Sequence, residues 1–103
     1  LVQLERYLAT MAAGDELQEK SKFAEARREY QRAKEILDTD EIRKRIADIE
    51  FNSLVAQARH MISIEQWDSA RALLRTAARI KDTELIRELF EQITERSGTD
   101  EEQ

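Results

Sequence analysis

Apolar side chains recur along this chain every three to four residues between charged ones, which is the pattern of amphipathic helices. The pattern predicts five helices, over about 2–20, 21–37, 40–63, 65–80 and 82–96. Ser21 offers an N-cap for the second helix, and Asp38-Thr-Asp-Glu41 has the form of a capping box for the third. No helix breaker follows until Ile64, so the third helix is expected to span roughly 24 residues, or about 36 Å.

The chain also repeats itself, without a gap, at an offset of 44 residues. The segment Phe23-Ala-Glu-Ala-Arg27 recurs as Trp67-Asp-Ser-Ala-Arg71. Further matches in this register are Ala12 with Ala56, Ala33 with Ala77, Ile36 with Ile80, Asp38-Thr39 with Asp82-Thr83, Ile42-Arg43 with Ile86-Arg87 and Ile49 with Ile93. Repeats of this length are usually supersecondary units that bury their apolar faces against neighbours. The sequence therefore predicts an all-α helical-repeat protein.

Composition supports this fold class, because the chain has no proline, only two glycines and 38% charged residues. Its 103 residues fit one domain. We expect that domain to cover residues 1–97 and a flexible acidic tail to cover 98–103. The net charge of −5 comes partly from this tail, so the body is nearly balanced. A balanced body disfavours nucleic acid as a partner, since phosphate contacts need a sustained positive field.

The chain carries no recognisable targeting signal. It has no run of about 18 apolar residues, so membrane insertion is not expected. Its N-terminus lacks the basic start and apolar run of a signal peptide, which favours a cytoplasmic location. Because position 1 is Leu rather than Met, we expect the chain to be part of a longer protein or a trimmed one.

The inventory of reactive side chains is small. With one histidine, no cysteine and no glycine-rich turn, neither a nucleophile–base pair nor a phosphate-binding loop can be assembled. His60 lies in the long helix with Gln57 three residues before it, which excludes a Glu-x-x-His metal motif. Basic residues such as Arg45 have acidic helical neighbours such as Glu41. The prediction is therefore a protein that is not an enzyme and has no cofactor or metal.

Two sets of residues resemble the tetratricopeptide repeat, a 34-residue pair of antiparallel helices. Over residues 7–40, the small, large and aromatic positions of the motif match Gly14, Leu17, Phe23, Ala26, Tyr30, Ala33 and Ile36. Over residues 51–84 they match Ala58, Met61, Trp67, Ala70, Leu74, Ala77 and Ile80. The resemblance implies a five-helix, antiparallel, right-handed array with units at 7–40 and 51–84 and a capping helix at 82–96.

The chain departs from this family in two ways. The proline that ends each repeat is replaced by Asp38 and Asp82, and about ten extra residues, 41–50, separate the two copies. The extra length suggests a long central helix. The first half also resembles the three-helix MIT domain, which binds short helical peptides, because Ala13-Gly-Asp-Glu-Leu17 leads through Phe23-Ala-Glu-Ala26 into a third helix.

Tetratricopeptide-repeat proteins bind peptides on the surface of the first helix of each pair. The resemblance assigns this role to Leu8, Met11, Asp15, Gln18, Glu19, Asn52, Val55, Arg59, Ile62 and Ser63. The Lys and Asn of the carboxylate-clamp subtype are replaced by Met11, Asp15, Val55 and Arg59, so a free C-terminal carboxylate is not the expected ligand. The leading interpretation is a non-catalytic protein–protein interaction module with Leu8, Met11, Val55 and Ile62 as anchors.

The alternative interpretation is a homo-oligomerisation module of a larger protein. The apolar arc of the first helix spans roughly 220°, which is wider than one neighbour can cover. Two repeats are also fewer than the three that repeat arrays generally need. A homodimer through this helix would answer both points, with an interface made by Leu4, Tyr7, Leu8 and Met11.

Overall fold

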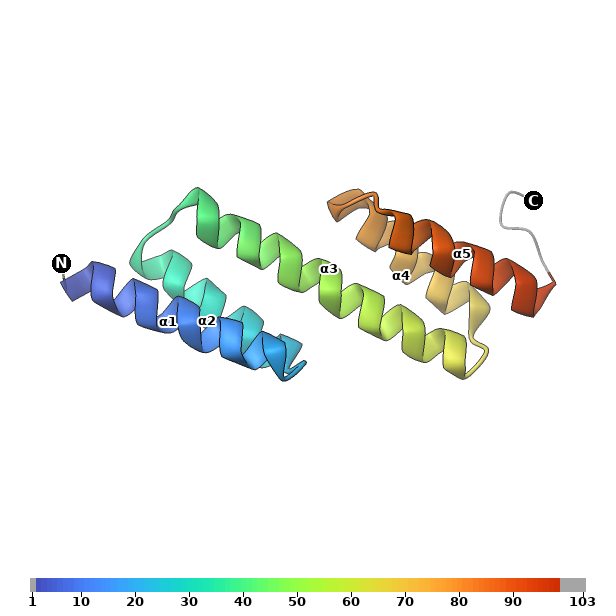
Figure 1. Cartoon of the computed structure of the whole chain (residues 1–103), viewed down its shortest axis with the longest axis horizontal. Coiled ribbons are helices and arrows are strands. Elements are labelled where there is room, and N and C mark those ends of the chain that lie inside the picture. Colours follow the sequence, from blue (N-terminus) through green and yellow to red (C-terminus); the bar gives the residue numbers. More distant parts are fainter. Residues whose placement is uncertain (1, 99–103) are drawn as a thin grey trace. The chain divides into compact units, whose positions relative to one another are not determined.

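The structure is a computed structural model that describes residues 2–98, and within that range every regular element is an α-helix. The helices are α1 (Val2–Glu19), α2 (Phe23–Ile36), α3 (Asp40–Ser63), α4 (Trp67–Ile80) and α5 (Glu84–Ser97) (Figure 1). The predictions of an all-α chain and of a central helix of 24 residues are confirmed. The tail expected to be flexible lies, from residue 99 onward, outside the described residues.

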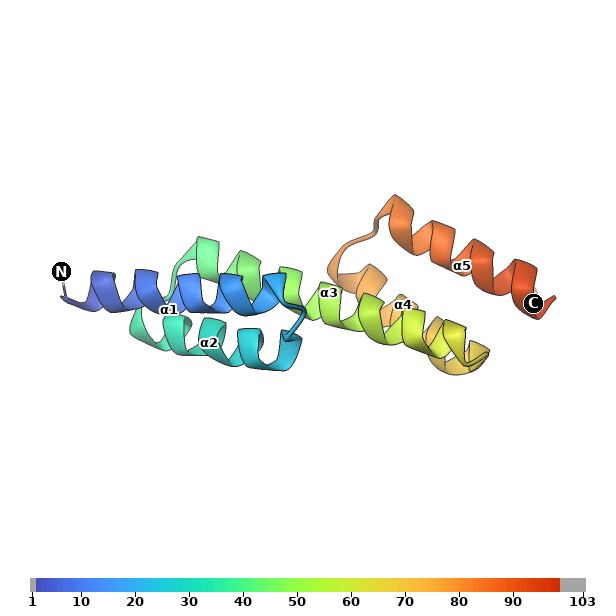
Figure 2. The same ribbon diagram turned by 60° about the horizontal axis from the view of Figure 1, so that its bottom comes forward.

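The chain divides into two compact units, and the boundary falls inside α3. Unit 1 (Leu1–Asn52) contains α1, α2 and the first half of α3, whereas unit 2 (Ser53–Gln103) contains the second half of α3 with α4 and α5. In unit 1, α1 and α2 lie side by side in both views (Figures 1 and 2). The long helix is thus the third helix of unit 1 and the first helix of unit 2.

The repeat of the sequence is also a repeat of backbone geometry. Ser21 and Glu65, which are 44 positions apart, both have φ of 59°, in the left-handed region. Lys22 and Gln66 follow them with φ of −89° and −91°, and each donates its amide to the carbonyl five residues earlier. The turns that lead into α2 and α4 therefore have the same construction.

These turns correct two predicted helix starts. Ser21 does not cap α2, because its left-handed backbone closes the end of α1 and no side-chain cap is present at Lys22. Glu65 likewise lies in the left-handed turn that follows α3, and α4 begins at Trp67. The sequence pattern placed both helix starts two residues early, because Ser21 and Glu65 have the left-handed backbone of a turn.

The start of α3 also differs from the predicted capping box. Thr39, rather than Asp38, caps this helix, because its Oγ1 accepts the amide of Ile42 at 3.1 Å. The Asp38 carboxylate instead accepts two hydrogen bonds from Arg43, at 2.8 and 2.7 Å. Thr83 has the same role at α5, where Oγ1 accepts the amide of Ile86 at 3.4 Å.

The two units bury equivalent sets of side chains. In unit 1, α1, α2 and α3 together enclose Tyr7, Met11, Ala26, Tyr30, Ala33, Ile42 and Ile49. The positions 44 residues later are Phe51, Val55, Ala70, Leu74, Ala77, Ile86 and Ile93, and all of them are buried. Each unit is therefore a three-helix arrangement in which small alanines on the middle helix allow close approach of the other helices.

Candidate functional site

A charged network joins the three helices of unit 1. Asp15 of α1 accepts hydrogen bonds from Arg45 Nε at 2.9 Å and Nη2 at 3.2 Å, both from α3. Asp15 also accepts the Tyr30 hydroxyl of α2 at 2.5 Å. A further bond, from Arg45 to Glu41 at 2.8 Å, confirms the predicted pair along α3. The network thus cross-links α1, α2 and α3 beside the core of the unit.

The protonation states in this network follow from its contacts. Burial raises the pKa of Asp15, but the hydrogen bonds from Arg45 and Tyr30 outweigh it, so the pKa lies below its ordinary value. Burial and the hydrogen bond to Asp15 raise the pKa of Tyr30. Asp15 is therefore an anion and Tyr30 a phenol at neutral pH. The charge-assisted hydrogen bonds to this carboxylate stabilise the arrangement of the three helices.

Four of the predicted site residues are buried in the cores of their own units. Relative exposure is 7% for Met11, 7% for Val55, 3% for Ile62 and 3% for Tyr7, whose hydroxyl hydrogen-bonds Thr39 Oγ1 at 2.5 Å. The sequence interpretation assumed that packing between the two helices of each pair does not use these side chains, so that they can contact a partner. The third helix of each unit contributes to the same cores, so these side chains are not available to a partner.

The polar members of the predicted set are separated. Gln18 and Asn52 are half-buried and contact each other, because Asn52 Nδ2 donates to Gln18 Oε1 at 3.3 Å. This pair lies in unit 1. Arg59 is exposed on the part of α3 that belongs to unit 2, and His60 beside it is exposed as well. The structure therefore brings Leu8, Gln18 and Asn52 into one unit without Arg59.

Two of the predicted apolar residues are exposed on α1. Leu4 is 44% exposed and Leu8 is 49% exposed. At about 100° per residue, they share one face of the helix with Ala12, within an arc of roughly 80°. Ala12 is exposed too. We call Leu4, Leu8 and Ala12 the leucine face.

A groove of about 480 Å³ lies between α1 and α3 in unit 1. It is lined by Asp15, Gln18, Glu19, Glu41, Lys44, Arg45 and Asp48. Carboxylates outnumber basic groups by four to two in this lining, so we call it the acidic groove. The α1 side of the groove continues the leucine face, because Asp15 follows Ala12 by three residues and Glu19 follows it by seven. Sequence reasoning missed this groove, since nothing in the local pattern indicates that α3 lies beside α1.

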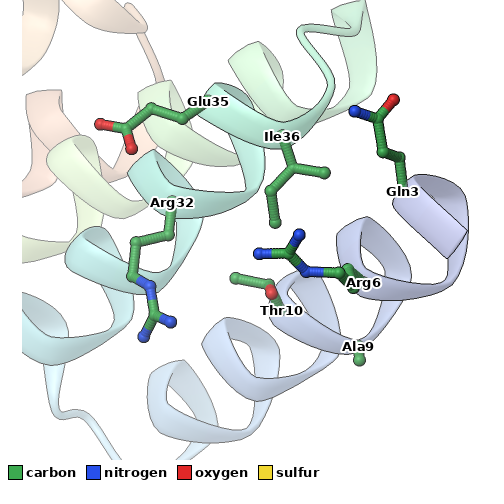
Figure 3. A pocket seen from close by; sticks show the side chains of 7 residues that line it. All are labelled: Gln3, Arg6, Ala9, Thr10, Arg32, Glu35 and Ile36. Carbon is green, nitrogen blue, oxygen red and sulfur yellow. The ribbon is translucent and has the colours of Figure 1, made fainter.

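A second groove of about 480 Å³ lies between α1 and α2. Its lining consists of Gln3, Arg6, Ala9, Thr10, Arg32, Glu35 and Ile36. Figure 3 shows Arg6 extending over the groove near Thr10 and Ile36, while Arg32 points away along α2. Arg32 is paired with Glu29 at 3.0 Å. The lining mixes basic, acidic and apolar groups and has no concentrated chemical character.

The described residues form neither a metal-ligating cluster nor a membrane-spanning helix. Over the part of the chain that the structure describes, no group of three or more His, Cys, Asp or Glu side chains is placed to hold a metal ion. No helix among these residues combines the length and apolar character needed to cross a bilayer. The leucine face and the acidic groove are the candidate functional surfaces.

Comparison with known proteins gives no relative. The chain matches no protein-family model, no curated protein and no solved structure. The resemblances to the tetratricopeptide repeat and to the MIT domain stay interpretations of the residues quoted for them. Function is therefore inferred from the surface of unit 1.

Proposed function

We propose that this protein is a non-catalytic interaction module that binds a helical segment of a partner protein against α1. The observation that supports the proposal is the exposure of Leu4 and Leu8 on one side of α1, while the inward positions Tyr7 and Met11 of the same helix are buried. Amphipathic helices bind other proteins through apolar residues at this spacing. Each Å² of apolar surface covered contributes about 25 cal/mol, so two leucines are effective anchors.

The proposed surface is narrower than the one the tetratricopeptide resemblance implies. Leu8 and Gln18 stay in it, whereas Met11, Val55 and Ile62 stabilise the units. We also propose that the units are tetratricopeptide-like, antiparallel and right-handed. In support, the turns into α2 and α4 share one geometry, and Ala26, Ala33 and their equivalents at 70 and 77 are fully buried.

A second candidate function is homo-oligomerisation through the same helix. It is supported by the same exposed pair, Leu4 and Leu8, from the predicted interface, although Tyr7 and Met11 would have no part in it. The two candidates differ in whether the leucine face binds a second copy of this chain or a different protein. Sedimentation velocity over a hundredfold range of concentration distinguishes them: a constant monomer rejects the oligomer, and a dimer that Leu4→Ser/Leu8→Ser abolishes supports it.

The test of the leading proposal is quantitative capture of proteins from the source cell by immobilised protein. Leu4→Ser/Leu8→Ser removes the leucine face. Ile64→Ser is the matched control, because Ile64 is also 49% exposed but lies in unit 2. We expect a defined set of partners to be retained by the wild type and by the control and lost by the double variant. Equal retention by all three proteins would refute the proposal.

A further inference from the structure

We infer that the segment bound by α1 is a basic amphipathic helix, whose apolar side covers the leucine face and whose Lys and Arg residues face the acidic groove. The inference rests on the proposed function and adds the chemistry of the partner. It depends on charge complementarity, because the surroundings of the leucine face are strongly biased toward acidic side chains.

The borders of the leucine face along α1 are acidic. Glu5 precedes Leu8 by three residues, and Glu16 follows Ala12 by four, so both lie next to the face on the helix surface. Glu19 continues the same line one turn further. All three carboxylates are exposed. Glu16 is paired with Lys20 at 3.6 Å, and Lys44 and Arg45 line the groove beside Glu19. A Lys or Arg on a partner can therefore reach several carboxylates around a shared apolar contact.

The groove beside this face is acidic as well, and its arginine is already engaged. Arg45 is 28% exposed in its side chain and is held by both Asp15 and Glu41. It therefore adds little positive potential for an incoming anion. By formal charge the lining is net negative, since it has four carboxylates and two basic groups. An incoming cation meets a negative field, whereas an incoming acidic segment is repelled.

The length of this surface sets the size of the partner helix. Leu4 and Glu19 are 15 residues apart in α1, which corresponds to about 22 Å at 1.5 Å per residue. A partner helix of about 15 residues, or four turns, spans this distance. The inference assigns it two or three apolar residues at i, i+3 or i+4 toward one end, and Lys or Arg residues flanking them and toward the other end.

The same charges disfavour a second copy of this chain as the occupant. Antiparallel pairing of two α1 helices through Leu4 and Leu8 would place Glu5 of each copy beside Glu5 of the other. Like charges at an interface are unfavourable and suppress the wrong partner. An extended basic peptide is also a poorer fit, because it cannot place apolar residues along a helical stripe.

The inference can be tested with three synthetic 18-residue amphipathic helices. They share one leucine stripe, and their polar positions next to it are all Lys, all Gln or all Glu. A fourth peptide has the composition of the Lys peptide in scrambled order. Fluorescence anisotropy at 50 and 300 mM salt gives the Kd of each. We expect the Lys peptide to bind at least tenfold more tightly than the Glu and scrambled peptides, with a preference that falls at high salt.

Variants of the full chain locate the site. Leu4→Ser/Leu8→Ser is expected to weaken the Lys peptide at least tenfold, and Glu5→Gln/Glu19→Gln is expected to weaken it several-fold and reduce the salt dependence. The controls, Ile64→Ser and Glu88→Gln, change one exposed apolar and one exposed acidic residue in unit 2 and should leave the Kd unchanged. Far-UV circular dichroism checks that each variant is folded.

The outcomes separate this inference from the proposed function. Binding of the Gln or Glu peptide as tightly as the Lys peptide, with loss in Leu4→Ser/Leu8→Ser, would overturn the basic partner and leave the interaction module standing. Binding of the scrambled Lys peptide as tightly as the ordered one would also overturn the inference. If no peptide depends on Leu4 and Leu8, both proposals fail. A dimer of the chain that depends on these leucines would make a second copy the occupant.

Discussion

The ring of Tyr30 lies so close to Gly14 that a Cβ on this glycine would be 2.5 Å from Tyr30 Cε1. Glycine inside a helix costs about 1 kcal/mol relative to alanine. Its presence in α1 is explained by the ring, which occupies the space of a side chain. At the equivalent positions of unit 2, Ala58 accompanies the smaller Leu74, and both are fully buried. In each unit, the size of the residue at this position of the first helix is thus matched to the size of its neighbour on the second helix: Gly14 to Tyr30, and Ala58 to Leu74.

This relationship predicts that Gly14→Ala is destabilising despite its higher helix propensity. Overpacking of a filled core costs about 1–3 kcal/mol. Tyr30 is fully buried and hydrogen-bonded to Asp15, so it cannot move away freely. In a Tyr30→Leu background, which copies unit 2, the same substitution should cost much less. Urea unfolding of the four proteins of this double-mutant cycle gives the coupling, and equal costs in both backgrounds would contradict the prediction.

Truncation of a buried residue of α1 should cost much more stability than truncation of an exposed one. Met11→Ala is expected to lower the free energy of unfolding by about 2–5 kcal/mol, because it leaves a cavity in unit 1. Val55→Ala, at the equivalent position of unit 2, should behave similarly. Leu8→Ala should change stability by only about 0.5 kcal/mol, since its side chain is half exposed. Thermal and urea denaturation measure all three, and a stable Met11→Ala protein would count against the buried placement of Met11.

The two helix caps provide a matched pair of substitutions. Thr39→Ala and Thr83→Ala each remove a cap bond at the start of a helix, which typically costs about 1 kcal/mol. Thr39 Oγ1 also hydrogen-bonds the hydroxyl of Tyr7, a residue only 3% exposed. Leaving that hydroxyl unsatisfied adds roughly 1–3 kcal/mol. Thr39→Ala should therefore be the more destabilising of the two in urea unfolding, and Thr39→Ser should restore most of the loss.

The local sequence pattern was sufficient to predict the helices, but not to predict which of their side chains are buried by neighbouring helices. The five helices, the length of α3 and the pair between Glu41 and Arg45 depend on spacing within one segment, and the sequence predicts them. The burial of Met11 and Val55 depends on the third helix of each unit. Because one continuous helix serves both units, no break in the sequence indicates that its two halves have different neighbours.

The candidate site was likewise only partly predictable from the sequence. Leu4 and Leu8 could be identified from the excess apolar arc of the first helix, and the structure leaves both exposed. The acidic groove could not, because it arises where α3 lies beside α1 and places Asp15 within hydrogen-bond distance of Arg45, 30 residues away in sequence. Charges that pair across helices carry no periodic signal, whereas charges that pair along one helix do.

Acid stability should depend on Asp15. Its pKa in the folded protein lies below the ordinary value near 3.8, because Arg45 and Tyr30 donate hydrogen bonds to the carboxylate. The stabilisation from this group is therefore fully present above about pH 5 and is lost as the pH falls through the lowered pKa. Asp15→Asn should cost about 1–2 kcal/mol at pH 7, a modest value because the Asp15 side chain is 40% exposed.

The direction in which the stability difference changes with pH makes this prediction specific to the charge of Asp15. The difference in unfolding free energy between the wild type and Asp15→Asn should shrink steadily between about pH 5 and pH 2, since both proteins then carry an uncharged group at this position. Tyr30→Phe removes one of the donors to Asp15, so it should raise the pKa of that carboxyl toward its ordinary value. Urea unfolding across this pH range measures the first effect, and the pH titration of the Asp15 side-chain carbonyl carbon by NMR measures the second. If the difference between wild type and Asp15→Asn is the same at pH 2.5 and pH 7, the carboxylate does not stabilise unit 1 through its charge.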